Sequence, residues 1–281
     1  MRSGFATLVG RTNVGKSTLL NRMVGTKVSI VSSRPNTTRH AIQGVLNRPD
    51  AQLVLVDTPG LHRPRTLLGR HLNQAAADAI SHVDVAVLVL DATAPVGPGD
   101  RRAAGEAGEG ALVAVNKIDA ARPAQVLAQL HAAAGLGLGE EAEYFPVSAQ
   151  TGEGIGELIE SMLARLPEGP RYFPEGVVSD RPDAFLVAEL VREQLLALVR
   201  DELPHSVACE VTEWEWPRIR CEVLVERESQ KGIVIGKGGS VLKAVGTAVR
   251  AQLPPGAYLE LFVKVERDWQ QRPAALARLG L

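Results

Sequence analysis

Gly10-Arg11-Thr12-Asn13-Val14-Gly15-Lys16-Ser17 is the stretch that decides the fold of the first half of this chain. It matches the pattern G-x-x-x-x-G-K-[ST]. The apolar residues 5–9 before it are predicted to form a buried strand, and residues 17–23 after it have a helical pattern. A glycine-rich loop between a strand and a helix allows successive backbone N–H groups to surround a phosphate. The stretch therefore predicts a nucleoside triphosphate site, in which Lys16 reaches the β- and γ-phosphates and the Ser17 hydroxyl binds Mg²⁺.

The overall composition describes an ordinary globular chain that is long enough for two domains. It has 281 residues, of which 45% are hydrophobic and 22% charged, and this excludes wholesale disorder. Because the formal net charge is −1, any contact with RNA or DNA must come from a local patch. The apolar runs are too short to span a bilayer, and residues 1–4 lead directly into the first strand without a signal peptide. We therefore expect a cytoplasmic protein in which Cys209 and Cys221 are reduced, buried thiols.

Strand-like and helix-like segments alternate from residue 1 to about residue 166. Several of the strands are continuous Val/Leu runs, which is typical of a parallel sheet covered by helices on both faces. The pattern predicts an α/β fold with a mostly parallel six-stranded sheet. The expected strands are residues 5–9, 41–47, 53–56, 85–90, 112–115 and 144–147, and the expected helices are residues 16–24, 68–80, 101–107, 124–134 and 155–166.

Two short motifs at predicted strand ends indicate which base is bound. In Asn116-Lys117-Ile118-Asp119, the Asp119 carboxylate can accept hydrogen bonds from guanine N1–H and the exocyclic amine, which adenine does not present. Because a hydrogen-bonding site strongly rejects analogues that lack the matching groups, Asp119 is the predicted specificity residue. Asn116 is expected to support the loop and contact guanine N7, and the Lys117 stem to lie across the ring. In Ser148-Ala149-Gln150, the Ala149 N–H is expected to reach guanine O6.

Two further segments are predicted to sense the γ-phosphate. Asp57-Thr58-Pro59-Gly60 follows a strand, so that Asp57 can hold Mg²⁺ through water and the Gly60 N–H can meet the γ-phosphate. Asn36-Thr37-Thr38-Arg39 lies in a polar stretch between the first helix and the second strand, and one of its threonines is expected to give its hydroxyl to Mg²⁺. Both segments would then respond to the presence of the γ-phosphate.

The second half of the chain has a different order of elements. Pro and Gly residues break the pattern after residue 166, and a predicted helix from 182 to 200 precedes two alternating strands, two helices and a strand over residues 258–265. Between those two helices, Gly236-Lys237-Gly238-Gly239 contains G-x-x-G, which lets a backbone turn approach a phosphodiester closely. Lys231, Lys237, Lys243 and Arg250 supply a local basic strip, although a solvated helix face remains an alternative interpretation. Trp214, Trp216 and Trp269 could either stack bases or pack.

These motifs together resemble the translation-factor-related GTPases over residues 1–166. Over nearly the full length the chain is similar to the bacterial Era GTPase family, whose C-terminal domain is of KH type, an α+β unit of order α-β-β-α-α-β. The resemblance implies a GTPase (G) domain at 1–166, a linker at 167–181 and a KH-type RNA-binding domain at 182–281. It implies GTP hydrolysis, binding of the 3′ end of 16S rRNA, assistance in 30S subunit assembly and no DNA partner, with peripheral association with the inner membrane as a further candidate.

The resemblance also implies roles for individual residues, and it makes Thr38 rather than Thr37 the Mg²⁺ ligand. The metal ligands would be Ser17, Thr38 and Asp57, and the catalytic residues Asn13, Lys16, Thr38, Asp57 and Gly60. The RNA-binding residues would be Lys231, Gly236, Lys237, Gly238, Gly239 and Lys243. The nucleotide-binding residues would be Gly10, Asn13, Val14, Gly15, Lys16, Ser17, Thr18, Asp57, Thr58, Pro59, Gly60, Asn116, Lys117, Asp119, Ser148, Ala149 and Gln150.

Leu61 and Thr12 depart from common patterns of these GTPases. Many GTPases carry a glutamine at the position of Leu61 to orient the attacking water, and a leucine has no polar atom for this. Either hydrolysis is lost, which would leave a non-catalytic GTP-gated RNA-binding module, or another group or ion supports it. By resemblance that ion is a candidate K⁺ held partly by Asn13. Thr12 stands where relatives usually have proline. Tandem-domain and tRNA-modification GTPases are a further alternative, but they lack the C-terminal domain found here.

Overall fold

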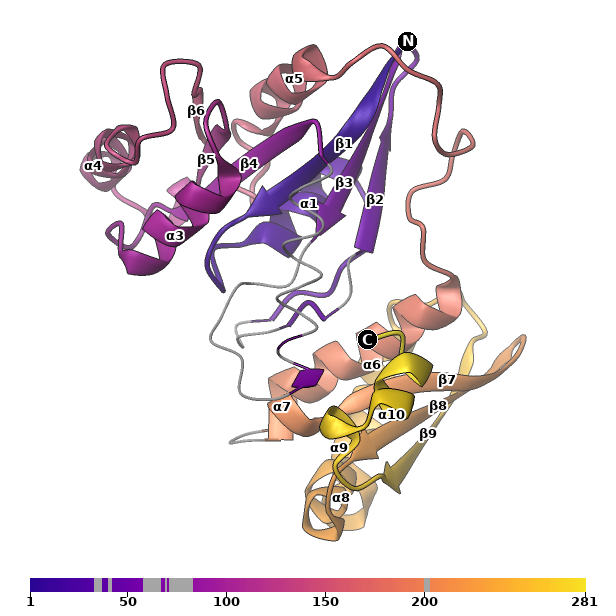
Figure 1. The fold of residues 1–281 in the computed structure, drawn as a ribbon. Coiled ribbons are helices and arrows are strands. Elements are labelled where there is room, and N and C mark those ends of the chain that lie inside the picture. The colour runs from indigo at the N-terminus through magenta and orange to yellow at the C-terminus, as the bar shows by residue number, and fades with distance from the viewer. Residues whose placement is uncertain (33–36, 40–41, 58–66, 69, 71–82, 200–202) are drawn as a thin grey trace. The chain divides into compact units, whose positions relative to one another are not determined.

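The computed structural model describes all residues of the chain except 33–36, 40–41, 58–66, 69, 71–82 and 200–202 (Figure 1). The chain forms two compact units, and each has its own hydrophobic core. The first unit consists of Met1–Ser29, Thr38–Arg63 and His71–Asp180, and the second of Ile30–Thr37, Pro64–Arg70 and Arg181–Leu281.

A six-stranded sheet organises the first unit, with the strand order β2-β3-β1-β4-β5-β6. Neighbouring strands are parallel except for the β2–β3 pair, which is antiparallel. This arrangement confirms the predicted mostly parallel sheet. The strands are β1 (Arg2–Val9), β2 (Ile42–Asn47), β3 (Ala51–Asp57), β4 (Val85–Asp91), β5 (Leu112–Asn116) and β6 (Tyr144–Pro146).

Helices cover both faces of this sheet, which explains why its strands are continuous apolar runs. Alternate residues of β4 belong to two different clusters: Val85, Val87 and Val89 pack with helices α1 (Lys16–Val24) and α5 (Ile155–Arg165). Leu88 and Leu90 pack with α3 (Pro98–Ala107) and α4 (Pro123–Ala134). Because both sets are buried, no polar residue interrupts the run until Asp91 at its end. The helix predicted over 68–80 lies mostly outside the described residues.

The predicted linker lies along the first sheet within the first unit. Ser3 N–H donates to the Pro167 carbonyl at 3.0 Å, and Val45 N–H of β2 donates to the Val178 carbonyl at 2.9 Å. Gly44 and Ser179 form an antiparallel bridge. Residues 177–180 therefore extend the edge of the sheet at β2, while the domain boundaries 1–166, 167–181 and 182–281 stay a prediction.

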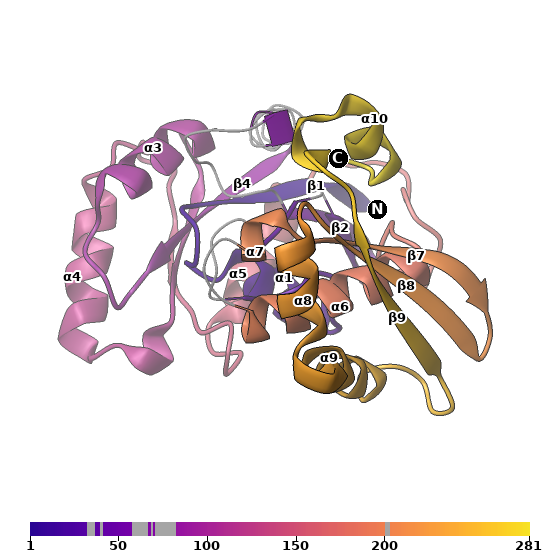
Figure 2. The same cartoon turned by 90° about the horizontal axis from the view of Figure 1, so that it is seen from below.

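The second unit contains a three-stranded sheet in which β7 and β8 are antiparallel and β8 and β9 are parallel (Figure 2). Apolar residues of α6, α9 and β8 form its core. The predicted order α-β-β-α-α-β is present, with a short α7 before the first strand and α10 at the C-terminus. The elements are α6 (Asp183–Leu198), α7 (Leu203–Ser206), β7 (Ala208–Glu215), β8 (Arg218–Val225), α8 (Glu228–Ile235), α9 (Ser240–Arg250), β9 (Tyr258–Val265) and α10 (Pro273–Arg278).

Some side chains of the second unit differ from the sequence expectation. Leu224, which strict alternation places on the polar face of β8, is fully buried. Arg278 of α10 pairs with Glu210 of β7, so the C-terminal helix covers this end of that face. Cys221 is buried but Cys209 is only half-buried, and both are free thiols. Trp269 is buried and donates its Nε1–H to the Ser206 carbonyl at 3.0 Å, whereas Trp214 and Trp216 are exposed.

One stretch of the described residues, Glu228–Arg250, is long and apolar enough to cross a membrane by length and composition alone. It is not one continuous helix, because α8 ends at Ile235 and α9 starts at Ser240. Neither piece, of 8 and 11 residues, approaches the roughly 20 residues that a spanning helix needs. This stretch is therefore weak evidence for a membrane span.

Candidate functional site

The phosphate loop connects β1 to α1 in a conformation that depends on Gly15. This residue has φ +100°, and a Cβ there would lie 2.4 Å from Nδ2 of Asn116. Lys16, the first residue of α1, is buried, and its Nζ donates to the carbonyls of Gly10 at 2.8 Å and Arg11 at 2.9 Å. Burial lowers the pKa of Lys16 to about 8, against the opposing effect of the Asp57 charge. The loop therefore holds a cation whose charge is only partly compensated.

The three predicted metal ligands converge on one carboxylate oxygen. Oδ2 of Asp57 lies 2.9 Å from Ser17 Oγ and 3.2 Å from Thr38 Oγ1, and the two hydroxyls are 3.1 Å apart. Asp57 is fully buried, and burial raises the pKa of its carboxyl. Its Oδ1 has no hydrogen-bond partner among the described residues. Hydroxyl and carboxylate oxygens are the ligands that Mg²⁺ prefers, so these residues fit the predicted ion.

The residues predicted to read the base are joined to the phosphate loop. Asn116 ends β5 and is buried, and its Nδ2 donates to the Val14 carbonyl at 2.9 Å. Ser148, also buried, donates to Oδ1 of Asp119 at 2.6 Å. The exposed carboxylate of Asp119 is therefore held in place by a buried hydroxyl while its remaining acceptor positions face outward.

The Ala149 amide is joined to the base-reading motif. Its N–H donates to Oδ1 of Asn116 at 2.9 Å, and its contact with guanine O6 stays a prediction. A buried amide oxygen needs a donor, and Ala149 is the donor that the structure provides. The Ala149 carbonyl in turn accepts from Arg22 Nε of α1 at 3.0 Å, and the Gln150 carbonyl accepts from the Arg22 guanidinium. Arg22 thus anchors this loop, a role that its sequence position does not reveal.

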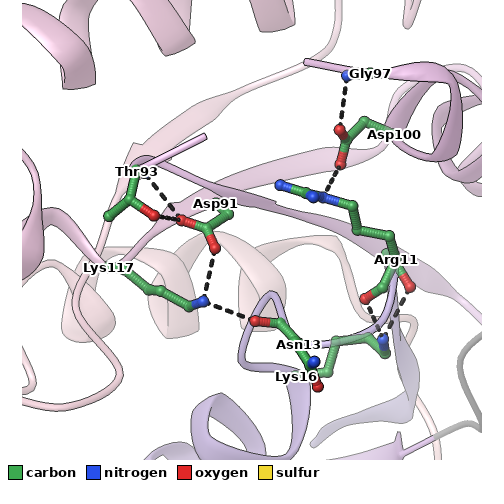
Figure 3. A network of polar contacts seen from close by, with 9 residues as sticks. Arg11, Asn13, Lys16, Asp91, Thr93, Gly97, Asp100 and Lys117 are labelled. Carbon is green, nitrogen blue, oxygen red and sulfur yellow. Dashed lines mark hydrogen bonds and ion pairs between the residues drawn. The ribbon is translucent and has the colours of Figure 1, made fainter. Parts of the chain in front are cut away.

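Several polar residues around the loops were not identified from the motifs. Ser29 is buried and donates to Oδ2 of Asp57 at 2.7 Å. Figure 3 shows two more ion pairs at these loops: Arg11 of the phosphate loop pairs with Asp100 of α3 at 3.0 Å, and Lys117 of the base-reading loop pairs with Asp91 of β4 at 2.6 Å. Asp91 lies at the carboxyl end of a parallel strand, where ligand sites of open α/β sheets form. This position in the sequence could have identified it as a residue of the site.

Part of the predicted site falls outside the described residues. This applies to Thr58, Pro59 and Gly60, and also to Leu61. Thr18 lies in the first turn of α1 and is half-buried. The structure thus brings together the phosphate loop, the metal ligands and the base-reading loop at the carboxyl-terminal ends of the parallel strands.

The second unit presents the predicted G-x-x-G loop between α8 and α9. Gly236 has φ +74°, and a Cβ there would meet Cγ2 of Val241 at 2.6 Å, so the turn requires glycine. Gly238 and Gly239 also have positive φ, and no heavy atom among the described residues lies within 4 Å of a Cβ built on either one. Lys237 and Lys243 are exposed and Lys231 is half-buried. The loop is therefore an open backbone turn flanked by exposed cations, as expected for a phosphodiester-binding element.

Comparisons with known proteins agree with both halves of this description. A family model described as 50S ribosome-binding GTPase matches residues 5–117, and a KH-domain model matches residues 202–270. The chain is 50% identical to the GTPase Era of Mycobacterium avium over 99% of this chain and 98% of that relative. The chain belongs to the Era GTPase family. The Era of Mycobacterium tuberculosis is 49% identical over the same shares of the two chains.

Solved Era structures have the same fold over the whole chain. The crystal structure of Era in complex with MgGDPNP and nucleotides 1506–1542 of 16S ribosomal RNA matches with a TM-score of 0.92 and 37% identity, covering 100% of this chain and 99% of that one. An Aquifex aeolicus Era variant bound to GDP·AlF₄⁻ matches with a TM-score of 0.92 and 36% identity over the same shares. The predicted P-loop GTPase fold with a C-terminal KH domain is confirmed, and the match assigns the chain to Era rather than to tandem-domain or tRNA-modification GTPases.

Proposed function

We propose that this Era-family GTPase binds and hydrolyses GTP with Mg²⁺ in its first unit and holds the 3′ end of 16S rRNA with its second. The observation that carries the proposal is the coexistence of two sites in one chain: the joined phosphate and base loops, and the open G-x-x-G turn between α8 and α9. The Era structure that matches over the full chain carries a GTP analogue and a 16S rRNA fragment.

The roles of the nucleotide-site residues follow from their chemistry. Lys16 would turn from the loop carbonyls to the β- and γ-phosphates, since a cation with incomplete compensation favours an anion. Ser17, Thr38 and Asp57 would hold Mg²⁺, which offsets phosphate charge when bound. Asp119, fixed by Ser148, would accept from guanine N1–H and the exocyclic amine. Asn116 would brace the two loops, and the Lys117 stem would cover the ring.

Hydrolysis in this chain would proceed without a switch glutamine, because Leu61 cannot orient water. We propose that Gly60 N–H meets the γ-phosphate and that a cation near Asn13, K⁺ being the candidate, opposes transition-state charge. Comparing phosphate release in KCl and in NaCl tests this. A markedly faster rate in KCl is expected, and equal rates would contradict a role for K⁺.

The second unit would clamp a single RNA strand at Gly236–Gly239, with Lys231, Lys237 and Lys243 close to its phosphates. Through this contact we propose that the protein assists 30S subunit assembly in the cytoplasm. Peripheral association with the inner membrane is a further proposal, supported only by the family resemblance. DNA is not a proposed partner.

A double variant of the loop, Lys237→Asp with Gly238→Asp, tests the RNA proposal. Lys237 is exposed, a Cβ built on Gly238 meets no heavy atom of the described residues within 4 Å, and aspartate tolerates positive φ better than most residues, so we expect the second unit to fold. Crosslinking to 16S rRNA in cells should be lost, while GTP hydrolysis by the purified protein should remain. Lys264→Asp, on β9 of the same unit, is the control: it makes the same lysine-to-aspartate change outside the loop and should crosslink normally. An unchanged crosslinking pattern in the double variant would overturn the proposed RNA site.

A further inference from the structure

Asp91 is a charged side chain beside the nucleotide loops that none of the sequence motifs includes. It ends β4, directly across from Asn116 of β5 in the parallel pairing. Its Oδ1 accepts from Thr93 N–H at 2.9 Å and from Thr93 Oγ1 at 2.6 Å, and its Oδ2 accepts from Lys117 Nζ at 2.6 Å. Each carboxylate oxygen is therefore engaged, and the side chain is held in one orientation (Figure 3).

The partner of Asp91 reaches the phosphate loop with the same ammonium group. Lys117 Nζ donates to the Asn13 carbonyl at 2.7 Å as well as to Asp91. Asn13 and Lys117 have φ +66° and +68°, a conformation that side-chain-bearing residues rarely adopt and that persists only where neighbours hold it. The ammonium of Lys117 thus connects the end of β4, the base-reading loop and the phosphate loop.

The charge of Asp91 suits it to hold this ammonium in place. Burial acts to raise the pKa of Asp91, but hydrogen bonds from Lys117 and Thr93 outweigh it, so that the pKa lies below its ordinary value. The carboxylate is accordingly ionised at neutral pH. Without it, Lys117 would keep only a neutral carbonyl acceptor, and a charge-assisted hydrogen bond would be lost.

We propose that Asp91 is a positioning residue for guanine nucleotide binding, acting through Lys117 to hold the base loop and the phosphate loop in one relative arrangement. The inference rests on guanine nucleotide binding and is independent of the proposed RNA role. Through Lys117, Asp91 is tied to the base-reading loop and to the Asn13 carbonyl of the phosphate loop, so it affects GDP and GTP binding equally. It leaves the rate of the chemical step unchanged once the nucleotide is bound.

Asp91→Asn tests this, because it keeps the shape of the side chain and removes its charge. Affinities for fluorescent GDP and for a non-hydrolysable GTP analogue should each fall about tenfold, through faster dissociation, as befits the loss of one charge-assisted contact. The kcat at saturating GTP should stay within about twofold of the wild type. Glu143→Gln is the matched control: it removes an ion pair of the same unit, to Arg165 at 2.8 Å, and should leave both affinities unchanged.

A double-variant cycle distinguishes positioning from general destabilisation. In a Lys117→Ala background, Asp91→Asn should change GDP affinity by less than about twofold, because the group it acts through is gone. A full tenfold loss in that background, or unchanged affinity of the single variant, would overturn the inference. Thr93→Val, which removes one bond to Asp91, should give a smaller loss in the same direction and serves if Asp91→Asn does not fold. Failure of the wild-type protein itself to bind GDP would instead contradict its proposed function.

Discussion

At the scale of single residues, the burial of Lys16 sets the pH range in which the phosphate loop carries a full positive charge. Its pKa is lowered from 10.5 to about 8 by burial. The unfolded chain therefore binds more protons than the folded one between about pH 8 and pH 10.5, and the stability contributed by this group rises with pH across that window. Below pH 8 the folded protein carries the cost of a buried ammonium, which nucleotide phosphates would relieve.

Nucleotide affinity should accordingly weaken as the pH rises above 8. Bound phosphates favour the ionised lysine, so GDP binding takes up a proton once Lys16 is neutral in the unbound protein. We expect a constant Kd around pH 7, and above pH 8 a rise that approaches tenfold per pH unit. Titration of fluorescent GDP at a series of pH values measures this. Lys16→Arg, which binds more weakly but stays charged, should give a flat profile; the same slope in both proteins would refute the assignment.

Single residues also mark the limit of what the sequence could predict about the site. Asp57, Asn116 and Asp119 stand in motifs with fixed spacing, so their side chains could be placed before the fold was seen. Ser29 and Arg22 could not, because each contacts a segment that is distant in sequence: Ser29 donates to Asp57 and Arg22 to the 149–150 backbone. No local pattern encodes such contacts. The bond from the Ala149 amide to Oδ1 of Asn116 could not be predicted either, because it joins two loops that meet only in three dimensions.

At the scale of secondary-structure elements, α6 carries a buried ion pair that the predicted amphipathic pattern did not indicate. Glu189 and Arg192 are 5% and 2% exposed, and their side chains form two contacts of 2.8 and 2.6 Å. Burial would lower the pKa of Arg192, but the charge of Glu189 and its hydrogen bonds keep it above the ordinary value. Both groups are therefore charged inside the unit, and each charge offsets the free-energy cost of burying the other.

Removing one partner should destabilise the second unit strongly. We expect Arg192→Met to lower the free energy of unfolding by about 3–5 kcal/mol, because the buried Glu189 carboxylate would lose the guanidinium that it contacts. Glu189→Leu combined with Arg192→Met should recover most of that loss, since both charges of the pair are then removed. Denaturant unfolding followed by the fluorescence of the buried Trp269 measures both variants. A double variant less stable than the single one would contradict this account.

The elements themselves were predicted well where local pattern and burial agree. Strand β4 was recognised as a continuous apolar run over residues 85–90, one residue shorter than the strand in the structure. The start of β1 was missed because Arg2, Ser3 and Gly4 look like a polar terminus, yet Ser3 is fully buried and donates to the Pro170 carbonyl at 2.6 Å. Ser3 and Pro170 lie near opposite ends of the first unit in the sequence, so no window of neighbouring residues could reveal their contact.

At the scale of the whole molecule, one boundary between the two units falls inside residues 36–39, a segment predicted to sense the nucleotide. Residues Ile30–Thr37 group with the second unit, and the next residue, Thr38, groups with the first and lies beside Ser17 and Asp57. A change at Thr38 is therefore one peptide bond from Thr37, which is assigned to the second unit. This motivates a coupling between nucleotide state and RNA binding.

We expect the affinity for a fragment of the 3′ end of 16S rRNA to differ about tenfold or more between the GDP form and the form with a non-hydrolysable GTP analogue, an ordinary coupling magnitude. By linkage, the RNA fragment should change the preference for the two nucleotides by the same factor. Fluorescence anisotropy of labelled RNA measures the first quantity, and nucleotide competition the second. Equal RNA affinities in both forms would rule out the coupling.

The strip of chain along β2 also affects how copies of this protein behave toward one another. β2 is the outermost strand of the large sheet, and residues 177–180 occupy its outer side through bonds to Val45, Asn47 and Gln43. An uncovered strand edge is a template for pairing with another chain. A fragment ending at residue 166 should therefore self-associate in size-exclusion chromatography, while one ending at residue 180 should remain monomeric. By this argument, we expect the segment that connects the two halves also to protect the protein from aggregation.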